Sequence, residues 1–286
     1  MTPRMTRRDV LQASGAMLLL GAAALPARAA SAVRIGMIPD AGATQVSIDE
    51  KAPLREYLSA KLRQPVELLI PTNYNATVEA LGNGSLDFAY LGGLTYLKAR
   101  EAYGVIPLMQ RTIDKQFHSL FITQTGSAIT KLTDLKGKRF AFGDVNSTSG
   151  HLMPDYALHN AGLDPDADLS ARYTGNHPAT AKAVESGAVD AGALDESVYK
   201  SLTDSGQIDK TKVRVFYTTL PFVDYVWVAR KEMPPAIRAG LATAFLSLRA
   251  PADEKVLAIL RGTSFVKADD AEYATLRAVA KRLKLL

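Results

Sequence analysis

The sequence repeats itself at a constant offset of 103 residues, and this repeat limits the folds that the chain can adopt. Eight of the 24 positions from 73 to 96 are identical to the positions 103 residues later, without a gap, from Asn73 on Asn176 to Tyr96 on Tyr199. A repeat of this size exceeds the roughly 20–50 residues of a solenoid unit. We therefore expect two similar lobes rather than a continuous array.

Each copy of the repeat lies in a passage where short apolar strands alternate with helices. In the first passage the predicted strands are 33–38, 66–70 and 86–91, and the predicted helices are 52–62, 76–81 and 95–103. In the second passage the strands are 139–142, 171–174 and 189–194, and the helices are 154–161 and 179–185. Such alternation is typical of an α/β fold with a largely parallel sheet, so we predict two α/β lobes.

Two extended apolar runs, 119–123 and 225–229, flank the second copy of the repeat. If the second lobe is inserted into the first, both runs are hinge strands, and the lobes enclose a cleft of the kind that binds small ligands. The predicted division is an export signal at 1–29, the first part of lobe 1 at 30–122, the inserted lobe 2 at 123–226, and a return to lobe 1 with C-terminal helices at 227–286.

The net charge of +5 and the pI near 9.2 suggest an anionic polymer as partner, but the charge is unevenly placed. Residues 1–29 have a basic start, an apolar stretch and a small-x-small end, as in an export signal. Arg7-Arg8 indicates the twin-arginine route, with a general-route signal as the alternative. This segment carries four arginines and one aspartate, so the rest of the chain has a net charge of +2. It also lacks a basic run, and we expect no nucleic-acid partner.

The sequence contains no cysteine, which excludes disulfides, a thiol nucleophile, Cys-ligated zinc and a lipid-modified cysteine anchor. The four histidines form no metal-binding pattern with carboxylates. The apolar stretch of the export signal is too short for a good membrane anchor. We therefore expect no metal, no cofactor, and a soluble monomer in the periplasm.

The segment 143–150 follows a predicted strand and precedes a predicted helix. Its backbone N–H groups would point at one site, next to the positive end of the helix dipole. Ser147, Thr148 and Ser149 add three hydroxyl groups, and the segment contains no lysine, unlike a nucleotide-binding phosphate loop. The pattern predicts a site for a small tetrahedral oxyanion. A helix N-cap with additional turn residues is the alternative.

Three polar rings lie at strand-to-helix turns. Tyr74 and His177 coincide in the repeat, each just before a helix, so they would face one another across the cleft as hydrogen-bond donors. Tyr96 follows the turn Leu91-Gly92-Gly93 and is a third candidate. The alternatives are an aromatic ring that packs on its own helix for Tyr74, a surface or N-terminal-turn histidine for His177, and a partly buried helix tyrosine for Tyr96.

Asp195 follows the strand of the second copy, and Asp224 lies beside the second hinge run. A carboxylate near an oxyanion is unfavourable unless it accepts a proton or a cation from the ligand. These residues could therefore select a protonated P–OH group or a ligand amine. We expect Glu196 to be a surface acid, and His118 and His159 to be structural or surface residues. His151, next to the anion segment, is a candidate to support it.

The segment 145–154, supported by 175–177 and 88–92, resembles the periplasmic phosphonate- and phosphite-binding proteins of ABC importers. The resemblance covers nearly all of the chain after the export signal. It implies a type II periplasmic-binding fold, in which two hinge strands join two α/β lobes around a ligand cleft. It also implies a non-enzymatic receptor that delivers a phosphorus oxyanion to a membrane permease. The implied ligand-binding residues are Tyr74, Tyr96, Ser147, Thr148, Ser149, His177, Asp195 and Asp224.

Two other functions remain open from the sequence. A receptor of the same fold for a sulfonate or a thiamine precursor needs a roomier, more aromatic pocket, whereas only 7% of this chain is aromatic, with one Trp. A secreted hydrolase would use Ser149, His177 and Asp224 as a nucleophilic set. No Gly-x-Ser-x-Gly elbow surrounds Ser149, which disfavours that alternative.

Overall fold

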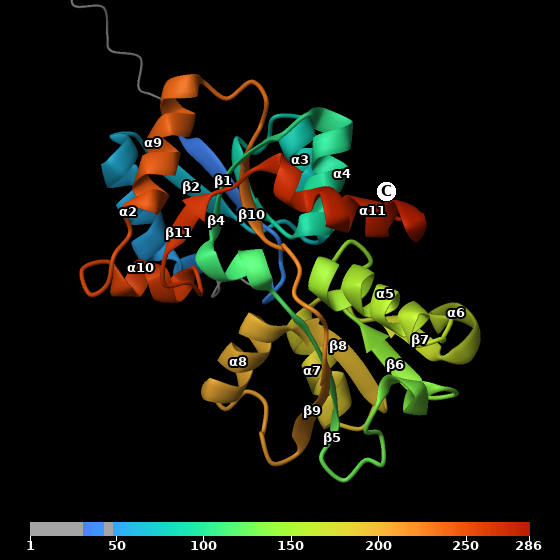
Figure 1. Ribbon diagram of the computed structural model, residues 1–286. Coiled ribbons are helices and arrows are strands. Elements are labelled where there is room, and N and C mark those ends of the chain that lie inside the picture. The colour runs from blue at the N-terminus through green and yellow to red at the C-terminus, as the bar shows by residue number, and fades with distance from the viewer. Residues whose placement is uncertain (1–30, 43–47) are drawn as a thin grey trace, which may run out of the picture. The chain divides into compact units, whose positions relative to one another are not determined.

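A computed structural model describes residues 31–42 and 48–286, and the predicted export signal at 1–29 lies outside this range. Residues 31–286 form one compact unit. Two mixed sheets, each covered by helices, form the cores of lobe 1 and lobe 2 (Figure 1). None of the helices in the described ranges has the length and apolar character that a membrane crossing requires.

Lobe 1 is built on a six-stranded sheet in the order β11-β4-β10-β3-β1-β2. In it β1 runs parallel to β2 and β3, whereas β10 runs antiparallel to both of its neighbours. The strands are β1 (Val33–Met37), β2 (Val66–Leu69), β3 (Phe88–Leu91), β4 (Ile106–Arg111), β10 (Val226–Ala229) and β11 (Phe265–Lys267). The helices are α2 (Ala52–Leu62), α3 (Tyr74–Gly82), α4 (Gly93–Tyr103), η1 (Thr112–Gln116), α9 (Pro235–Leu246), α10 (Glu254–Ile259), η4 (Asp270–Tyr273) and α11 (Ala274–Arg282).

Lobe 2 is built on a five-stranded sheet in the order β7-β6-β8-β5-β9. Its strands are β5 (Ser119–Gln124), β6 (Arg139–Phe142), β7 (Ser170–Tyr173), β8 (Ala191–Asp195) and β9 (Val213–Thr218). Its helices are η2 (Leu132–Leu135), η3 (Thr148–Leu152), α5 (Met153–Asn160), α6 (Pro165–Asp168), α7 (His177–Glu185) and α8 (Glu196–Asp204). The predicted α/β fold with two lobes is therefore confirmed.

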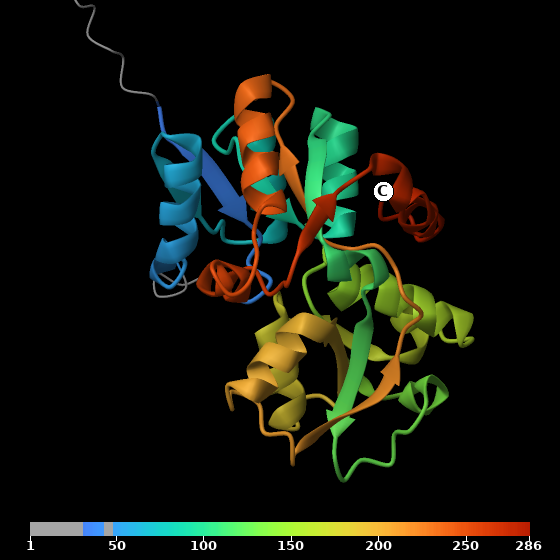
Figure 2. The same ribbon diagram turned by 60° about the vertical axis from the view of Figure 1, so that its left-hand side comes forward.

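The chain crosses between the lobes in two segments beside the runs predicted as hinges (Figure 2). The first segment, 112–118, joins β4 of lobe 1 to β5 of lobe 2, and the second, 219–225, joins β9 to β10. The segments pair with each other, because the N–H groups of Phe117 and Phe222 donate to the opposite carbonyls at 2.8 and 2.9 Å. The apolar runs at 119–123 and 225–229 lie within or beside β5 and β10. The apolar character of these runs correctly indicated strands. It did not indicate that the first strand belongs to the sheet of lobe 2 and the second to the sheet of lobe 1.

The sequence repeat corresponds to a repeated local structure. α3 and α7 each have nine residues, and each begins after an Asn N-cap whose side chain accepts a hydrogen bond from an alanine N–H, at 2.8 Å for Asn73 and 2.9 Å for Asn176. Both helices begin two residues earlier than predicted because these caps precede Tyr74 and His177. The turns that follow need a left-handed backbone, which Gly84 and Gly187 supply with φ of 77° and 72°.

Candidate functional site

The segment 143–150, predicted to bind an anion and called the anion loop below, ends in a tight helical turn. The π-helical turn η3 leads directly into α5, so helical structure begins earlier than predicted. Ser147 is the N-cap, and its hydroxyl accepts a hydrogen bond from the Gly150 N–H at 3.0 Å. The Gly143 N–H donates to the Gly150 carbonyl at 2.8 Å and closes the loop on itself. Single π turns occur frequently at functional sites.

The three hydroxyl residues of the loop are buried but have different partners. The Ser147 hydroxyl stabilises the loop, as described above. The Thr148 hydroxyl oxygen accepts a hydrogen bond from the Leu94 N–H of lobe 1 at 2.9 Å. The Ser149 hydroxyl is fully buried and has no hydrogen-bond partner within the described ranges of the chain. Ser149 is therefore the residue of the three whose hydroxyl is unpaired among the described residues, whereas the hydroxyls of Ser147 and Thr148 each accept one hydrogen bond and keep a proton to donate.

His177, the first residue of α7, is fully buried against the loop. Its Nδ1 lies 3.3 Å from the backbone N–H of Asp195, which donates to it, so the ring proton is on Nε2. Burial lowers the pKa of His177 and keeps the ring neutral. Nε2 lies 3.5 Å from the Tyr225 hydroxyl. A Cβ at Gly150 would lie only 2.9 Å from the His177 ring, so the ring needs glycine there.

Tyr74, the first residue of α3, occupies the equivalent place in lobe 1. Only 1% of its surface is exposed, and its hydroxyl has no hydrogen-bond partner among the described residues, although the Ser147 hydroxyl is near enough to lower its pKa slightly. Burial raises the pKa of Tyr74, and the charges of Asp40, Asp144 and Asp195 raise it further. The hydroxyl therefore keeps its proton and is a donor for an anion.

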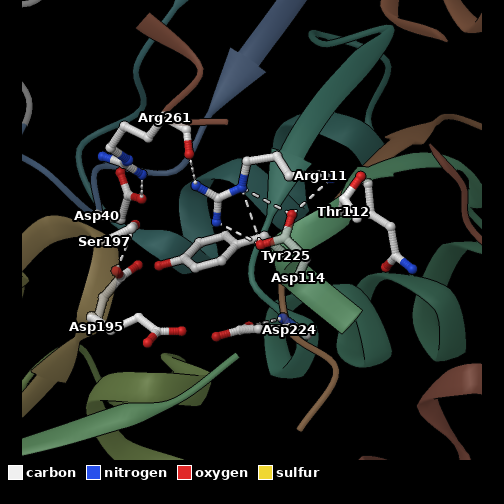
Figure 3. Close-up of polar contacts among 12 residues, drawn as sticks. Asp40, Arg111, Thr112, Asp114, Asp195, Ser197, Asp224, Tyr225 and Arg261 are labelled. Atoms are coloured by element: carbon white, nitrogen blue, oxygen red, sulfur yellow. Dashed lines mark hydrogen bonds and ion pairs between the residues drawn. The ribbon is translucent and has the colours of Figure 1, made fainter. Parts of the chain in front are cut away.

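Asp195 and Asp224 are both fully buried, and their carboxyl groups point toward one another in Figure 3. In each, one oxygen is engaged: Asp195 Oδ1 accepts from the Val198 N–H at 2.8 Å, and Asp224 Oδ1 accepts from the Gly93 N–H at 2.8 Å. The other oxygen, Oδ2, has no hydrogen-bond partner in either residue within the part of the chain that the structure describes. The pair can therefore make two more polar contacts with a ligand.

The two carboxyl groups have opposite pKa shifts. Burial raises the pKa of Asp224 to about 8; hydrogen bonds from Gly93 and Thr148 oppose this, and the charge of Asp195 adds to it. Burial also acts to raise the pKa of Asp195, but the charge that His177 carries when protonated at low pH and the charges of Arg261 and Arg111 outweigh it, so this pKa lies below the ordinary value. At neutral pH Asp224 therefore carries a proton and Asp195 carries a charge. One is a donor and the other an acceptor.

The buried polar groups described so far form one cluster between the lobes. Three further residues belong to this cluster and were not predicted. The hydroxyls of Tyr90 and Ser119 are buried and have no hydrogen-bond partner in the described part of the chain. Ser119 lies opposite Asp195 in the β5–β8 pair, and the Tyr90 ring stacks on the Tyr225 ring at 4.9 Å. Tyr225 directly follows Asp224, so its place in the chain was a signal that could have found it. Ser119 carried no such signal.

Tyr96 lies apart from the cluster. Its hydroxyl donates to Asp270, and its ring packs against Tyr273 with 4.8 Å between the ring centroids. The structure thus gives this predicted ligand residue a partner in the C-terminal segment. Tyr90 and Tyr96 lie on either side of Gly92-Gly93 in the chain. The register of β3 decides toward which face the Tyr90 side chain points, and this register could not be predicted from the sequence.

Two arginines lie near the tyrosines, and each is held by its own carboxylate (Figure 3). Arg111 is fully buried, pairs with Asp114 at 2.5 Å, and places its guanidinium 5.1 Å from the centroid of the Tyr225 ring. Arg261 pairs with Asp40. Both charges are compensated, so the free groups of the cluster are mainly neutral hydroxyls, although Arg261 Nε is also buried without a hydrogen-bond partner among the described residues.

The cluster gathers six buried polar atoms that lack a hydrogen-bond partner among the described residues. Buried polar groups in folded proteins are nearly always paired, so such a concentration indicates a place for a ligand. Four atoms are hydroxyl oxygens and two are carboxyl oxygens. They belong to Tyr74, Tyr90, Ser119, Ser149, Asp195 and Asp224. The described residues contain no group of three or more His, Asp or Glu side chains placed to hold a metal ion.

Known proteins are similar to this chain in sequence and in fold. Residues 35–273 match the family described as the periplasmic substrate-binding protein of phosphonate ABC transporters. The chain is 30% identical over 267 residues to a probable ABC transporter phosphite-binding protein, PhnD1, of Prochlorococcus marinus, and the match covers 88% of this chain and 89% of the relative. It is 27% identical to the phosphate-import protein PhnD of Mycolicibacterium smegmatis, over 68% of this chain and 64% of the relative.

A solved structure of PhnD1 from Prochlorococcus marinus in complex with methylphosphonate has the same fold. The TM-score is 0.82 at 30% sequence identity, and the match covers 89% of this chain and 99% of the other. The structural similarity thus extends over both lobes and both crossing segments, and the type II periplasmic-binding fold is confirmed.

Proposed function

The chain belongs to the periplasmic substrate-binding proteins of phosphonate ABC transporters, and we propose that the buried cluster between its lobes holds a small phosphorus oxyanion for delivery to the permease. A phosphonate or phosphite is the ligand class that this cluster fits best. The protein acts as a receptor and not as an enzyme.

The observation that carries this proposal is the mixture of unpaired donors and acceptors in one buried place. Hydroxyls such as those of Tyr74 and Ser149 can donate to phosphoryl oxygens. The ionised Asp195 needs a donor in return, which a P–OH group or a ligand ammonium supplies. Protonated Asp224 can donate as well. Hydrogen bonds to a charged group in such a dry site are worth about 1.5–3 kcal/mol each.

In the proposed site the donors are the hydroxyls of Tyr74, Tyr90, Ser119 and Ser149, the His177 Nε2–H and backbone N–H groups of η3. Asp195 and Asp224 select the protonation state of the ligand. Ser147 and Thr148 keep the loop in shape and in contact with lobe 1. Tyr96 is left out because Asp270 already accepts from its hydroxyl.

Phosphate is the second candidate ligand, because it also carries a P–OH group at neutral pH and a relative is described as a phosphate-import protein. A sulfonate fits less well, since it has no proton at neutral pH to offer to Asp195. The hydrolase alternative lacks its hydrogen-bond relay: the Ser149 hydroxyl has no partner, and His177 Nδ1 accepts from a backbone N–H instead of donating to a carboxylate.

The family assignment supports a periplasmic location, and with it we propose that residues 1–29 act as an export signal, by the twin-arginine route, and are removed. The mature protein is proposed to be a soluble monomer without a lipid anchor. Comparing the size and location of the protein in cells with the variant Arg7→Lys plus Arg8→Lys tests the route. Unchanged export would contradict the twin-arginine proposal.

Calorimetric titration of the mature protein with phosphite, methylphosphonate, 2-aminoethylphosphonate, hypophosphite, phosphate and sulfate tests the ligand class. We expect at least one phosphorus compound to bind and sulfate to bind far more weakly. Failure of all phosphorus compounds to bind would contradict the proposal.

Serine variants test the place of binding. Ser149→Ala removes an unpaired donor and is expected to weaken binding without loss of stability. Ser147→Ala plus Thr148→Ala, which also removes bonds within the loop and to Leu94, is expected to abolish binding in a folded protein. Ser186→Ala, at the end of α7 in the same lobe, is the control. Retained affinity in both loop variants would refute the proposed site.

A further inference from the structure

The first turns of α4 make direct hydrogen bonds to the anion loop, from lobe 1 to lobe 2. The Leu94 N–H donates to the Thr148 hydroxyl oxygen at 2.9 Å. The Thr95 hydroxyl donates to the Asn146 carbonyl at 3.0 Å, and Lys98 Nζ donates to Asn146 Oδ1 at 2.6 Å. None of these atoms belongs to the unpaired set described above. The contacts therefore hold the lobes together without a ligand atom.

Asn146 contributes to its own loop through its backbone, whose N–H donates to Asp144 Oδ1 at 2.7 Å. Its side-chain oxygen instead accepts from Lys98 in the other lobe. Lys98 is partly buried, and burial lowers its pKa while the charge of Asp144 opposes that shift. A charge-assisted bond that is partly shielded from water is stronger than an exposed one.

We propose that Thr95, Lys98 and Asn146 form a latch that sets the closed fraction of the protein and so sets its affinity without selecting the ligand. In a protein that binds in its closed form, the apparent Kd is the intrinsic Kd divided by the closed fraction. A contact made only in the closed form and apart from the ligand therefore changes the affinity for every ligand by one common factor. Residues that touch the ligand change the order of affinities instead.

The closed fraction can be measured without any ligand. Because the chain has no cysteine, Glu56→Cys on α2 and Lys200→Cys on α8 give one spin-label pair, with one label on an exposed position of each lobe. Both helices lie on the left of Figure 1. The distance distribution between the labels then reports opening of the lobes in the full mature protein.

Lys98→Met keeps most of the aliphatic side chain and removes the latch donor. Without ligand, we expect the ratio of closed to open molecules to fall about 3- to 10-fold, the range for a partly exposed charge-assisted bond. Lys182→Met, whose amine pairs with Glu185 on the same helix, is the control and is expected to leave the distribution unchanged. An unchanged distribution in Lys98→Met would overturn the latch.

A double-mutant cycle separates the latch from a general structural effect. Asn146→Ala alone is expected to open the protein, and adding Lys98→Met is expected to open it no further, because the shared bond is already lost. Additive effects would overturn the pairing. The third readout, which alone rests on the proposed function, is the affinity for each phosphorus compound that binds. We expect one common fold-change, and a changed order of ligands would overturn the latch even where the distances agree.

Discussion

Tyr74 and His177 occupy equivalent places in the two lobes, but their polar atoms have different neighbours. Each follows an Asn N-cap, begins a nine-residue helix and is buried. The Tyr74 hydroxyl has no hydrogen-bond partner among residues 31–42 and 48–286, whereas His177 accepts from the Asp195 N–H and lies beside the Tyr225 hydroxyl. Lobe 1 thus offers a free donor, and lobe 2 a donor whose orientation and tautomer are already fixed.

Gly92 and Asp195 form a second equivalent pair with unlike side chains. Both are N-caps, of α4 and α8. A Cβ at Gly92 would lie 3.2 Å from the Thr148 hydroxyl oxygen and 3.5 Å from Asp224 Oδ1, so the missing side chain lets the lobes approach. Asp195 places a carboxylate in the same cluster. The two lobes thus share one local structure, but they differ at two equivalent pairs of positions, Tyr74 with His177 and Gly92 with Asp195. These differences make the site asymmetric.

The largest loss of affinity is expected when Gly92 is replaced by aspartate, the residue at the equivalent position 195 of lobe 2. Gly92→Asp places a third carboxyl group beside Thr148 and Asp224, so both closure and anion binding become unfavourable. We expect the affinity to fall more than about 100-fold, that is by about 3 kcal/mol or more. Because Asp is a favourable N-cap, α4 itself is not destabilised.

Calorimetry with the best phosphorus ligand measures this effect, and thermal unfolding checks the fold. Gly126→Asp is the matched control, since nothing lies within 4 Å of a Cβ at that glycine. An affinity within threefold of wild type in Gly92→Asp would refute the role given to Gly92.

The next effect distinguishes the two rings. Tyr74→Phe is expected to weaken binding about 10- to 150-fold, the equivalent of about 1.5–3 kcal/mol, with no loss of stability in the ligand-free protein. His177→Phe is expected to weaken binding and also to destabilise the fold by about 1–3 kcal/mol, because the Asp195 N–H loses its acceptor. Binding isotherms and denaturant titrations test both. Equal stability losses in the two variants would contradict the view that, of the two rings, only His177 has a hydrogen-bond partner within the described part of the fold.

A smaller effect concerns the pH dependence that Asp224 confers. Since its pKa is about 8, wild type loses the Asp224 proton above that pH, and an oxyanion then meets a second charged carboxylate. The ratio of the wild-type Kd to that of Asp224→Asn is expected to rise about tenfold between pH 7 and pH 9. Titration of the ligand itself cancels in this ratio. A ratio that stays constant across this range would show that Asp224 is not protonated in the free protein.

The same raised pKa has a consequence for stability. A carboxyl group with a higher pKa in the folded than in the unfolded state binds its proton more tightly when folded, so stability falls as pH rises from about 4 to about 8. Relative to Asp224→Asn, wild type is therefore expected to lose free energy of unfolding across this window. A constant difference between the two proteins would contradict the assignment.

The smallest effect on affinity is expected for the helix N-caps, which the two lobes have in common. Asn73→Ala and Asn176→Ala each remove one N-cap bond of similar length and should each cost about 0.5–2 kcal/mol of stability. Because each side chain is engaged in its own helix cap, we expect the affinity of both variants to stay within about threefold of wild type. Urea unfolding compares them, and a large affinity loss in only one would show that the caps are not equivalent.

Local patterns predicted much of the fold. The helix predicted at 52–62 has those bounds, and the repeat located both lobes. The strands β4, β9 and β11 were not predicted. Pro107 interrupts the pattern of β4, and the short β11 depends on pairing with β4 and on packing of Phe265 against Phe245, which are contacts with distant parts of the sequence.

The candidate site could be predicted only in part. The Ser-Thr-Ser loop was visible because its residue types and its place between strand and helix suffice to indicate an anion site. Which of its hydroxyls is free depends on long-range bonds, such as that from Leu94 to Thr148, which no local pattern reveals. The same reason separates Tyr96 from Tyr90, since only tertiary packing decides which ring reaches Asp270.

The central claim is that donors from both lobes hold one phosphorus oxyanion. A crystal structure of the protein with methylphosphonate tests it most directly. We predict phosphonate oxygens within hydrogen-bond distance of the Tyr74 hydroxyl, the His177 Nε2 and the Ser149 hydroxyl at once, with Asp195 or Asp224 accepting from or donating to the same group. A phosphonate held by arginine or lysine side chains, or by residues of one lobe alone, would contradict the account.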